Sequence, residues 1–174
     1  MVRPFFRSRL RAFQAMLGDT PDPGFIATLE YLENRDLDLS IRIGGLLAFN
    51  ALMTTIGTHP ISASPGAPLS LDAPTQPVLT LLSLVGLLPL VWSSILCLRA
   101  LLLGEEFETE GLEEGLVAGP DPDQVQKLQR RLFAAFIHSI DAQAHCLRQS
   151  VIATFTGGAL TIAVWAAILW YKMV

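Results

Sequence analysis

The stretch from Val78 to Leu98 contains no charged residue and constrains the fold more than any other part of the chain. A helix rises about 1.5 Å per residue, so a segment of this length crosses a hydrocarbon core of about 30 Å. A soluble helix this long would carry a polar stripe, whereas the polar groups here are only hydroxyls, one indole and one thiol. Because a hydroxyl can bond a carbonyl of the preceding turn, these groups are compatible with lipid. We therefore expect a membrane-spanning helix over 78–98.

Two more segments have the length and apolarity of membrane spans, Ile41 to Thr58 and Val151 to Tyr171. The latter is free of charge and gathers aromatic residues near its far end, as membrane-interface belts do. The composition agrees, because only 16% of the residues are charged, whereas soluble domains carry about 25%. The sequence predicts an all-α membrane protein with three transmembrane helices.

The first forty residues, 1–40, are predicted to lie outside the membrane as amphipathic helices. Phe6, Leu10 and Phe13 share one helical face, and arginines at positions 3, 7 and 11 share another, which is typical of a helix on an anionic membrane surface. A mitochondrial transit peptide and a plain basic arm are the alternative interpretations. A second amphipathic helix over 25–38 is expected to lead into the first span.

The remaining segments connect or extend the spans. The loop 59–77 is rich in proline and is expected to be extended, and it joins the first two spans into a hairpin over 41–103. The linker 104–123 is acidic and contains no Lys or Arg, which favours a loosely held segment. From 124 to 174 the pattern predicts one helix of nearly fifty residues, half of it cytosolic and half in the third span.

The basic residues predict the orientation of the spans. Arginines before the first span and Lys or Arg between the second and third spans lie on one side, and the 59–77 loop contains none. The positive-inside rule then places the N-terminus and the acidic linker in the cytoplasm. We expect a multi-pass protein with the 59–77 loop outside.

Asn50 lies near the middle of the first span, and an amide at that depth needs a partner, which we expect on another helix. Because we expect the three spans to bury little polar surface against one another, we predict that this partner comes from a second chain. Arg42 lies at the start of the same span and can reach the membrane interface. The pair Gly44-Gly45 offers a place for close approach of a neighbouring helix.

His138, Asp141 and His145 fall within about 60° of one another on a helical wheel. Zinc could use such side chains, but the spacing supplies no fourth ligand, so we favour a polar stripe that also includes Arg148. Phe136 and Ile140 mark an apolar face of the same helix, which we expect to contact a second chain. We expect no catalytic site, metal, cofactor or nucleic-acid partner, because no span holds a central Asp, Glu or His and no phosphate-binding loop occurs.

Two stretches resemble the small membrane effectors of bacterial Pycsar antiphage systems. These enter their first span through a basic residue, then small and apolar residues, then Asn eight positions later, and Arg42 to Asn50 is similar. Gln143 to Ser150 resembles their junction between a polar helix and the last span. The chain departs from the family at two positions. It has Ser40 where the family often has Asp, and it has Ile43 where Ala is expected from the family.

The resemblance implies a non-enzymatic, homo-oligomeric effector of the bacterial inner membrane. Such a protein responds to a cyclic pyrimidine nucleotide and damages the membrane of its host, so membrane lipid and the nucleotide are its expected partners. The alternative is a structural or accessory subunit of a larger membrane complex. An enzyme is the least favoured interpretation.

Overall fold

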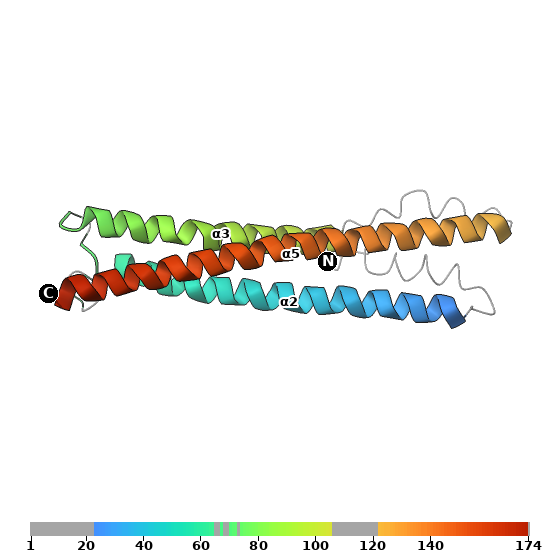
Figure 1. The fold of residues 1–174 in the computed structure, drawn as a ribbon, viewed down its shortest axis with the longest axis horizontal. Coiled ribbons are helices and arrows are strands. Elements are labelled where there is room, and N and C mark those ends of the chain that lie inside the picture. The colour runs from blue at the N-terminus through green and yellow to red at the C-terminus, as the bar shows by residue number, and fades with distance from the viewer. Residues whose placement is uncertain (1–22, 65–66, 68–69, 73, 106–121, 174) are drawn as a thin grey trace, which may run out of the picture. The chain divides into compact units, whose positions relative to one another are not determined.

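The computed structural model describes residues 23–64, 67, 70–72, 74–105 and 122–173. Three helices account for almost all of them: α2 (Pro23–Ser62), α3 (Pro77–Glu105) and α5 (Pro122–Met173) (Figure 1). No strand occurs within those ranges. Each helix is long and apolar enough to cross a membrane. The prediction of an all-α protein with three candidate membrane spans is confirmed.

The helices are longer than a bilayer requires. They contain 40, 29 and 52 residues, whereas about 20 residues cross a hydrocarbon core. Helix α2 joins the segment 25–38 to the first predicted span without a break, and α5 continues through Gly157 and Gly158, as predicted. The predicted surface helix at the N-terminus and most of the acidic linker lie outside the described residues.

Contacts divide the chain into two units. Among the described residues, the first comprises those of 23–41 and 100–144, and the second comprises those of 42–99 and 145–173. We call the second the membrane unit, because it holds the predicted spans almost entirely. These units group residues by contact in space. The segments predicted above instead follow the order of the chain: 1–40, 41–103, 104–123 and 124–174.

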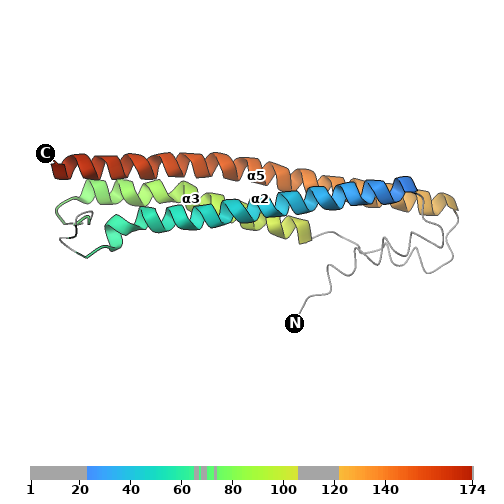
Figure 2. The same ribbon diagram turned by 90° about the horizontal axis from the view of Figure 1, so that it is seen from below.

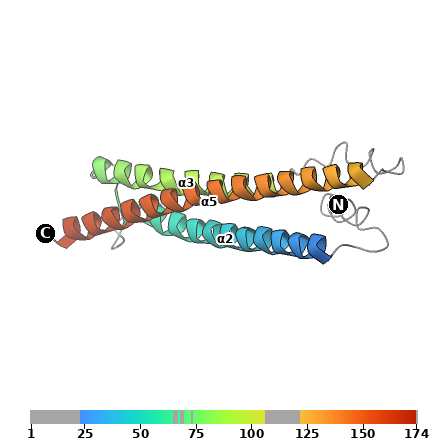
Figure 3. The same ribbon diagram turned by 45° about the vertical axis from the view of Figure 1, so that its right-hand side comes forward.

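In the membrane unit, α2 and α5 run in the same direction and α3 runs against them (Figure 1, Figure 2 and Figure 3). Large apolar side chains such as Phe49, Leu88 and Phe155 are exposed on its surface, and polar ones are buried inside. This distribution suits a lipid environment, because hydrocarbon solvates apolar side chains and leaves polar ones to find partners within the protein.

Glycines let the helices of the membrane unit approach closely, but not at the predicted pair. A Cβ atom on Gly157 would lie 2.6 Å from Leu90 Cγ, and one on Gly57 would lie 2.5 Å from a methyl carbon of Leu87. A Cβ on Gly44 or Gly45 would meet nothing within 4 Å. The expectation of close approach at Gly44-Gly45 is therefore wrong within this chain.

The proline-rich segment is partly helical, which corrects the expectation of an extended loop. Helix α2 continues through Pro60 to Ser62, and the fully buried Pro60 ring contributes packing that offsets its missing N–H. The Pro60 carbonyl accepts a hydrogen bond of 2.7 Å from the Leu71 N–H. Leu71 then packs with Val164 and Ile168 of α5.

The first unit has its own apolar contacts. Phe25 of α2 and Phe133 of α5 meet edge to face, with ring centroids 5.2 Å apart. Phe136 and Ile140 are buried among the residues of their own chain. We expected Phe136 and Ile140 to contact a second chain. For these two residues that expectation does not hold, because their side chains are already buried within their own chain.

Candidate functional site

Three polar side chains meet inside the membrane unit, one from each helix. Asn50 of α2 and Ser93 of α3 are 0% exposed, and Thr154 of α5 is buried as well. The Asn50 amide nitrogen donates to Ser93 Oγ at 2.7 Å. Thr154 Oγ1 donates to Asn50 Oδ1 at 2.8 Å, and the two hydroxyl oxygens lie 2.7 Å apart.

The direction of each hydrogen bond follows from the proton count. A hydroxyl has one proton to donate. Since Thr154 donates its proton to Asn50, Ser93 is the donor wherever it bonds Thr154. These groups can therefore close a ring in which Asn50 donates to Ser93, Ser93 to Thr154 and Thr154 back to Asn50. The Ser150 carbonyl, 2.9 Å from Ser93 Oγ, is a second acceptor for the single Ser93 proton, so the ring is closed only when that proton is donated to Thr154. Hydrogen bonds arranged head to tail polarise and strengthen one another, especially where the dielectric constant is low.

Ser150 and Cys97 extend this ring toward the next turn of α5 and α3. Ser150 Oγ donates to the Ser93 carbonyl at 2.9 Å and lies 2.6 Å from Ser93 Oγ. Cys97 Sγ lies 2.9 Å from Ser150 Oγ, so the thiol can donate to a hydroxyl whose own proton is already used. We call these five residues (Asn50, Ser93, Cys97, Ser150 and Thr154) the polar cluster.

Helical spacing places these residues together. Ser93 and Cys97 are four residues apart on α3, and Ser150 and Thr154 are four apart on α5, so each pair shares one helical face. Gly157 follows Thr154 by three residues and lies against Leu90, which brings α5 close enough to α3 for short side chains to bond. The cluster therefore depends on small residues around it.

The structure corrects the expected behaviour of the hydroxyls. Ser94 does donate to a carbonyl of its own helix, that of Leu90, and Thr80 donates to the carbonyl of Gln76, the residue just before α3. Ser93 bonds other helices instead, and Ser83 donates to the Gly57 carbonyl across the interface with α2. The expectation that the spans bury little polar surface against one another is wrong.

The prediction that Asn50 bonds another helix is confirmed, but its partners lie in the same chain. Both heteroatoms of its amide are bonded, so the amide does not require a second chain. The sequence did not identify Ser93 and Thr154 as its partners, nor Ser150 as a further member of the polar cluster. The available signal was the four-residue spacing of small polar residues on two different spans.

The other predicted site residues lie outside the polar cluster. Exposed on their helices are Arg42, His138, Asp141, His145 and Arg148. His145 Nε2 lies 3.0 Å from the Gln149 side-chain nitrogen, within one turn of α5. Among the described residues, no three His, Cys, Asp or Glu side chains are grouped so that they could hold a metal ion.

The polar cluster consists of hydroxyl, amide and thiol groups, without a carboxylate, imidazole or amine. Such groups hold helices in register and can exchange their mutual hydrogen bonds for bonds to water if the helices separate. Comparisons with protein-family models, curated proteins and solved structures found no match for this chain.

Proposed function

We propose that this chain is a non-enzymatic membrane effector that self-associates and perturbs the membrane in which it sits. In this proposal it lies in a bacterial inner membrane with its N-terminus in the cytoplasm. A signal on the cytosolic side, a cyclic pyrimidine nucleotide, switches it as part of antiphage defence. The long helix α5 carries the signal to the third span.

The polar cluster is the observation that carries this proposal. In the observed state its groups satisfy one another, so the bundle presents an apolar surface to lipid. If the spans separate, the same neutral groups bond water at membrane depth, where an apolar interior would exclude it. A bundle of this kind therefore has a dry state and a hydrated state that a signal can select between.

The resemblance adds support from a second direction. Asn50 is the last residue of the first stretch that resembles these effectors, which begins at Arg42. Ser150 is the last residue of the second stretch, which begins at Gln143. Both side chains bond Ser93 of α3. The two stretches that resemble antiphage effectors therefore contribute to the same cluster.

Dye release from vesicles tests the proposal. The purified chain is reconstituted into vesicles that contain a self-quenching dye, and cyclic CMP or cyclic UMP is added outside or enclosed within. We expect release with one of the two nucleotides and none with cyclic AMP. A matched variant, Thr156→Val, should behave as the parent, because Thr156 bonds its own helix. An absence of release with every nucleotide, together with an unchanged membrane potential in cells that express the protein, would refute the proposal.

A second candidate function, an accessory subunit of a larger complex, has one observation in its favour. Tyr31 and Leu37 of α2 precede the predicted span, yet they are 67% and 59% exposed. Exposed apolar side chains outside the membrane are available for contact with another subunit. Stable co-purification with other membrane subunits, lost in Tyr31→Ser with Leu37→Ser, would favour this function over the effector.

A further inference from the structure

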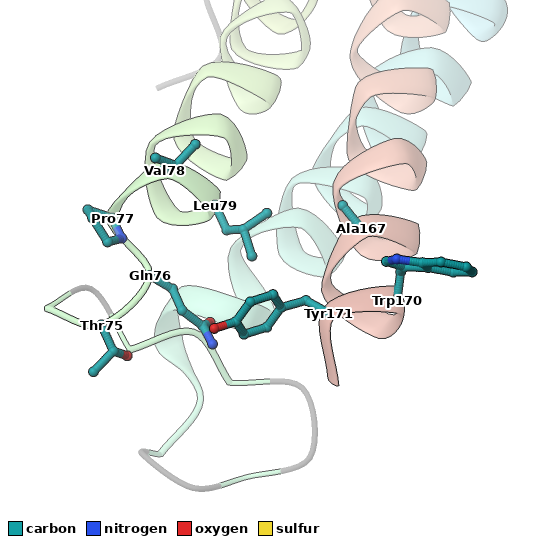
Figure 4. A pocket seen from close by; sticks show the side chains of 8 residues that line it. All are labelled: Thr75, Gln76, Pro77, Val78, Leu79, Ala167, Trp170 and Tyr171. Atoms are coloured by element: carbon teal, nitrogen blue, oxygen red, sulfur yellow. The ribbon is translucent and has the colours of Figure 1, made fainter. Parts of the chain in front are cut away.

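A hollow of about 410 Å³ lies at one end of the membrane unit, between the start of α3 and the end of α5 (Figure 4). Pro77, Val78 and Leu79 form the α3 wall, and Ala167 with Tyr171 forms the α5 wall. The hollow is open on one side. Its walls are apolar, so water is a poor occupant.

One polar atom in this hollow has no partner among the described residues. Gln76 lines the hollow, and its Oε1 atom is buried without a hydrogen bond. Figure 4 shows the Tyr171 ring reaching toward the end of the Gln76 side chain. A buried acceptor that remains unbonded costs free energy. Because this oxygen is closed to solvent in the structure, a rotation of the Gln76 side chain is required before it can accept an N–H or O–H from an occupant of the hollow.

A cation lies next to Tyr171 in the sequence. Lys172 Nζ donates to the Ala67 carbonyl at 3.2 Å, and an ammonium group has three protons to donate. Lys172 does not line the hollow itself, but its remaining protons can bond an anion that extends beyond the hollow at the same end of the bundle. A ligand that suits these groups carries an apolar part, a negative charge and a hydrogen-bond donor.

The position of the hollow selects among such ligands. It lies at the ends of two helices that are apolar enough to cross a membrane, and Trp170 beside it is 74% exposed. Exposed Trp and Tyr at the end of a span occupy the level of the lipid headgroups. The hollow therefore opens where acyl chains meet headgroups.

We propose that this hollow binds one phospholipid whose headgroup carries a hydrogen-bond donor. An acyl chain lies against Val78, Leu79 and Ala167, and the phosphate pairs with Lys172. The headgroup ammonium or hydroxyl donates to Gln76 Oε1. This lipid site goes beyond the proposed effector function and does not depend on it.

Native mass spectrometry of the full chain tests the site. The chain is purified in detergent with equal amounts of phosphatidylethanolamine, phosphatidylglycerol and phosphatidylcholine of the same acyl composition. We expect one retained lipid per chain, with ethanolamine or glycerol headgroups preferred over choline by about tenfold, since the choline headgroup has no donor. Equal retention of all three lipids, or retention of none, would overturn the proposal.

Variants separate the contribution of the lipid headgroup from that of the lipid acyl chain. Gln76→Leu should keep the bound lipid but lose the preference over phosphatidylcholine, whereas Ala167→Phe should fill the hollow and abolish retention. The matched control is Ala159→Phe, on an exposed position of the same helix away from the hollow, and it should retain lipid as the parent does. The parent protein without lipid could instead show twice the mass of one chain and return to the mass of one chain when lipid is added. That result would show that a second copy of the chain occupies the hollow, and it would overturn the lipid site.

Discussion

At the residue scale, the face of a helix decides what a hydroxyl does in this protein. Thr154 and Thr156 are two residues apart on α5, yet Thr154 bonds Asn50 across the bundle and Thr156 bonds the Ile152 carbonyl of its own helix. The same contrast separates Ser93 from Ser94 on α3. Residue type alone therefore does not identify a member of the polar cluster.

This contrast predicts unequal effects of the same substitution. Thr154→Val keeps the volume but opens the ring and leaves Asn50 Oδ1 without its donor. Interhelical hydrogen bonds in membranes average about 0.6 kcal/mol and reach about 1.7 kcal/mol, so we expect a loss of about 1–2 kcal/mol in the free energy of unfolding. Thr156→Val should change it by less than about 0.5 kcal/mol. Titration with a denaturing detergent measures both, and equal losses would contradict the ring.

At the element scale, α5 lies close against α3 where a glycine removes the side chain. Gly157 lies against Leu90, including its backbone nitrogen at 3.1 Å from an added Cβ. Its neighbour Gly158 would place a Cβ 3.9 Å from the Met53 methyl, which is an ordinary contact. Adjacent glycines of α5 therefore have different packing roles.

These glycines give a prediction with a built-in control. Gly157→Ala should lower the free energy of unfolding by about 1–3 kcal/mol, because the added methyl overpacks a backbone contact. Gly158→Ala should be neutral or stabilising by up to about 1 kcal/mol, because alanine is the better helix former and the space is available. The same detergent titration compares them. Similar behaviour of both variants would show that α5 does not pack on α3 through Gly157.

The sequence predicted the helices better than their contacts. The charge-free stretches at 78–98 and 151–171 determined two of the spans, since length and apolarity alone decide whether a helix can cross lipid. The partners of Asn50 could not be predicted in the same way, because they depend on the rotation and register of three helices that lie far apart in the chain. Pro60 illustrates the same limit, because burial of its ring keeps it within α2.

At the scale of the whole molecule, the distribution of charge predicts the orientation of the chain in its membrane. Lys and Arg lie before the first span and between the second and third, and the loop 59–77 contains none. A single cysteine introduced at Ser64, on a background without Cys97 and Cys146, should react with a membrane-impermeant reagent in intact cells. A cysteine at Gly111 should react only after permeabilisation. The reverse labelling pattern would contradict the proposed cytoplasmic N-terminus.

The three spans of one chain pack around a polar cluster that forms within that chain. Ser93 Oγ and Ser150 Oγ lie 2.6 Å apart, so cysteines at both positions can form a disulfide with little movement. The background again lacks Cys97 and Cys146. A matched control places cysteines at Trp92 and Phe155, which are both exposed to the surroundings.

The decisive measurement is oxidation of the Ser93→Cys, Ser150→Cys variant in native membranes with a membrane-permeant oxidant, followed by gel electrophoresis without reductant. We predict that the free thiols disappear while the band stays at the mass of a single chain, and that the control pair remains reduced. A band at the mass of two chains, absent from each single-cysteine variant, would show that the cluster forms between chains. Thiols that remain free would show that the spans do not meet there, and either result would contradict the packing of the three spans around a cluster within one chain.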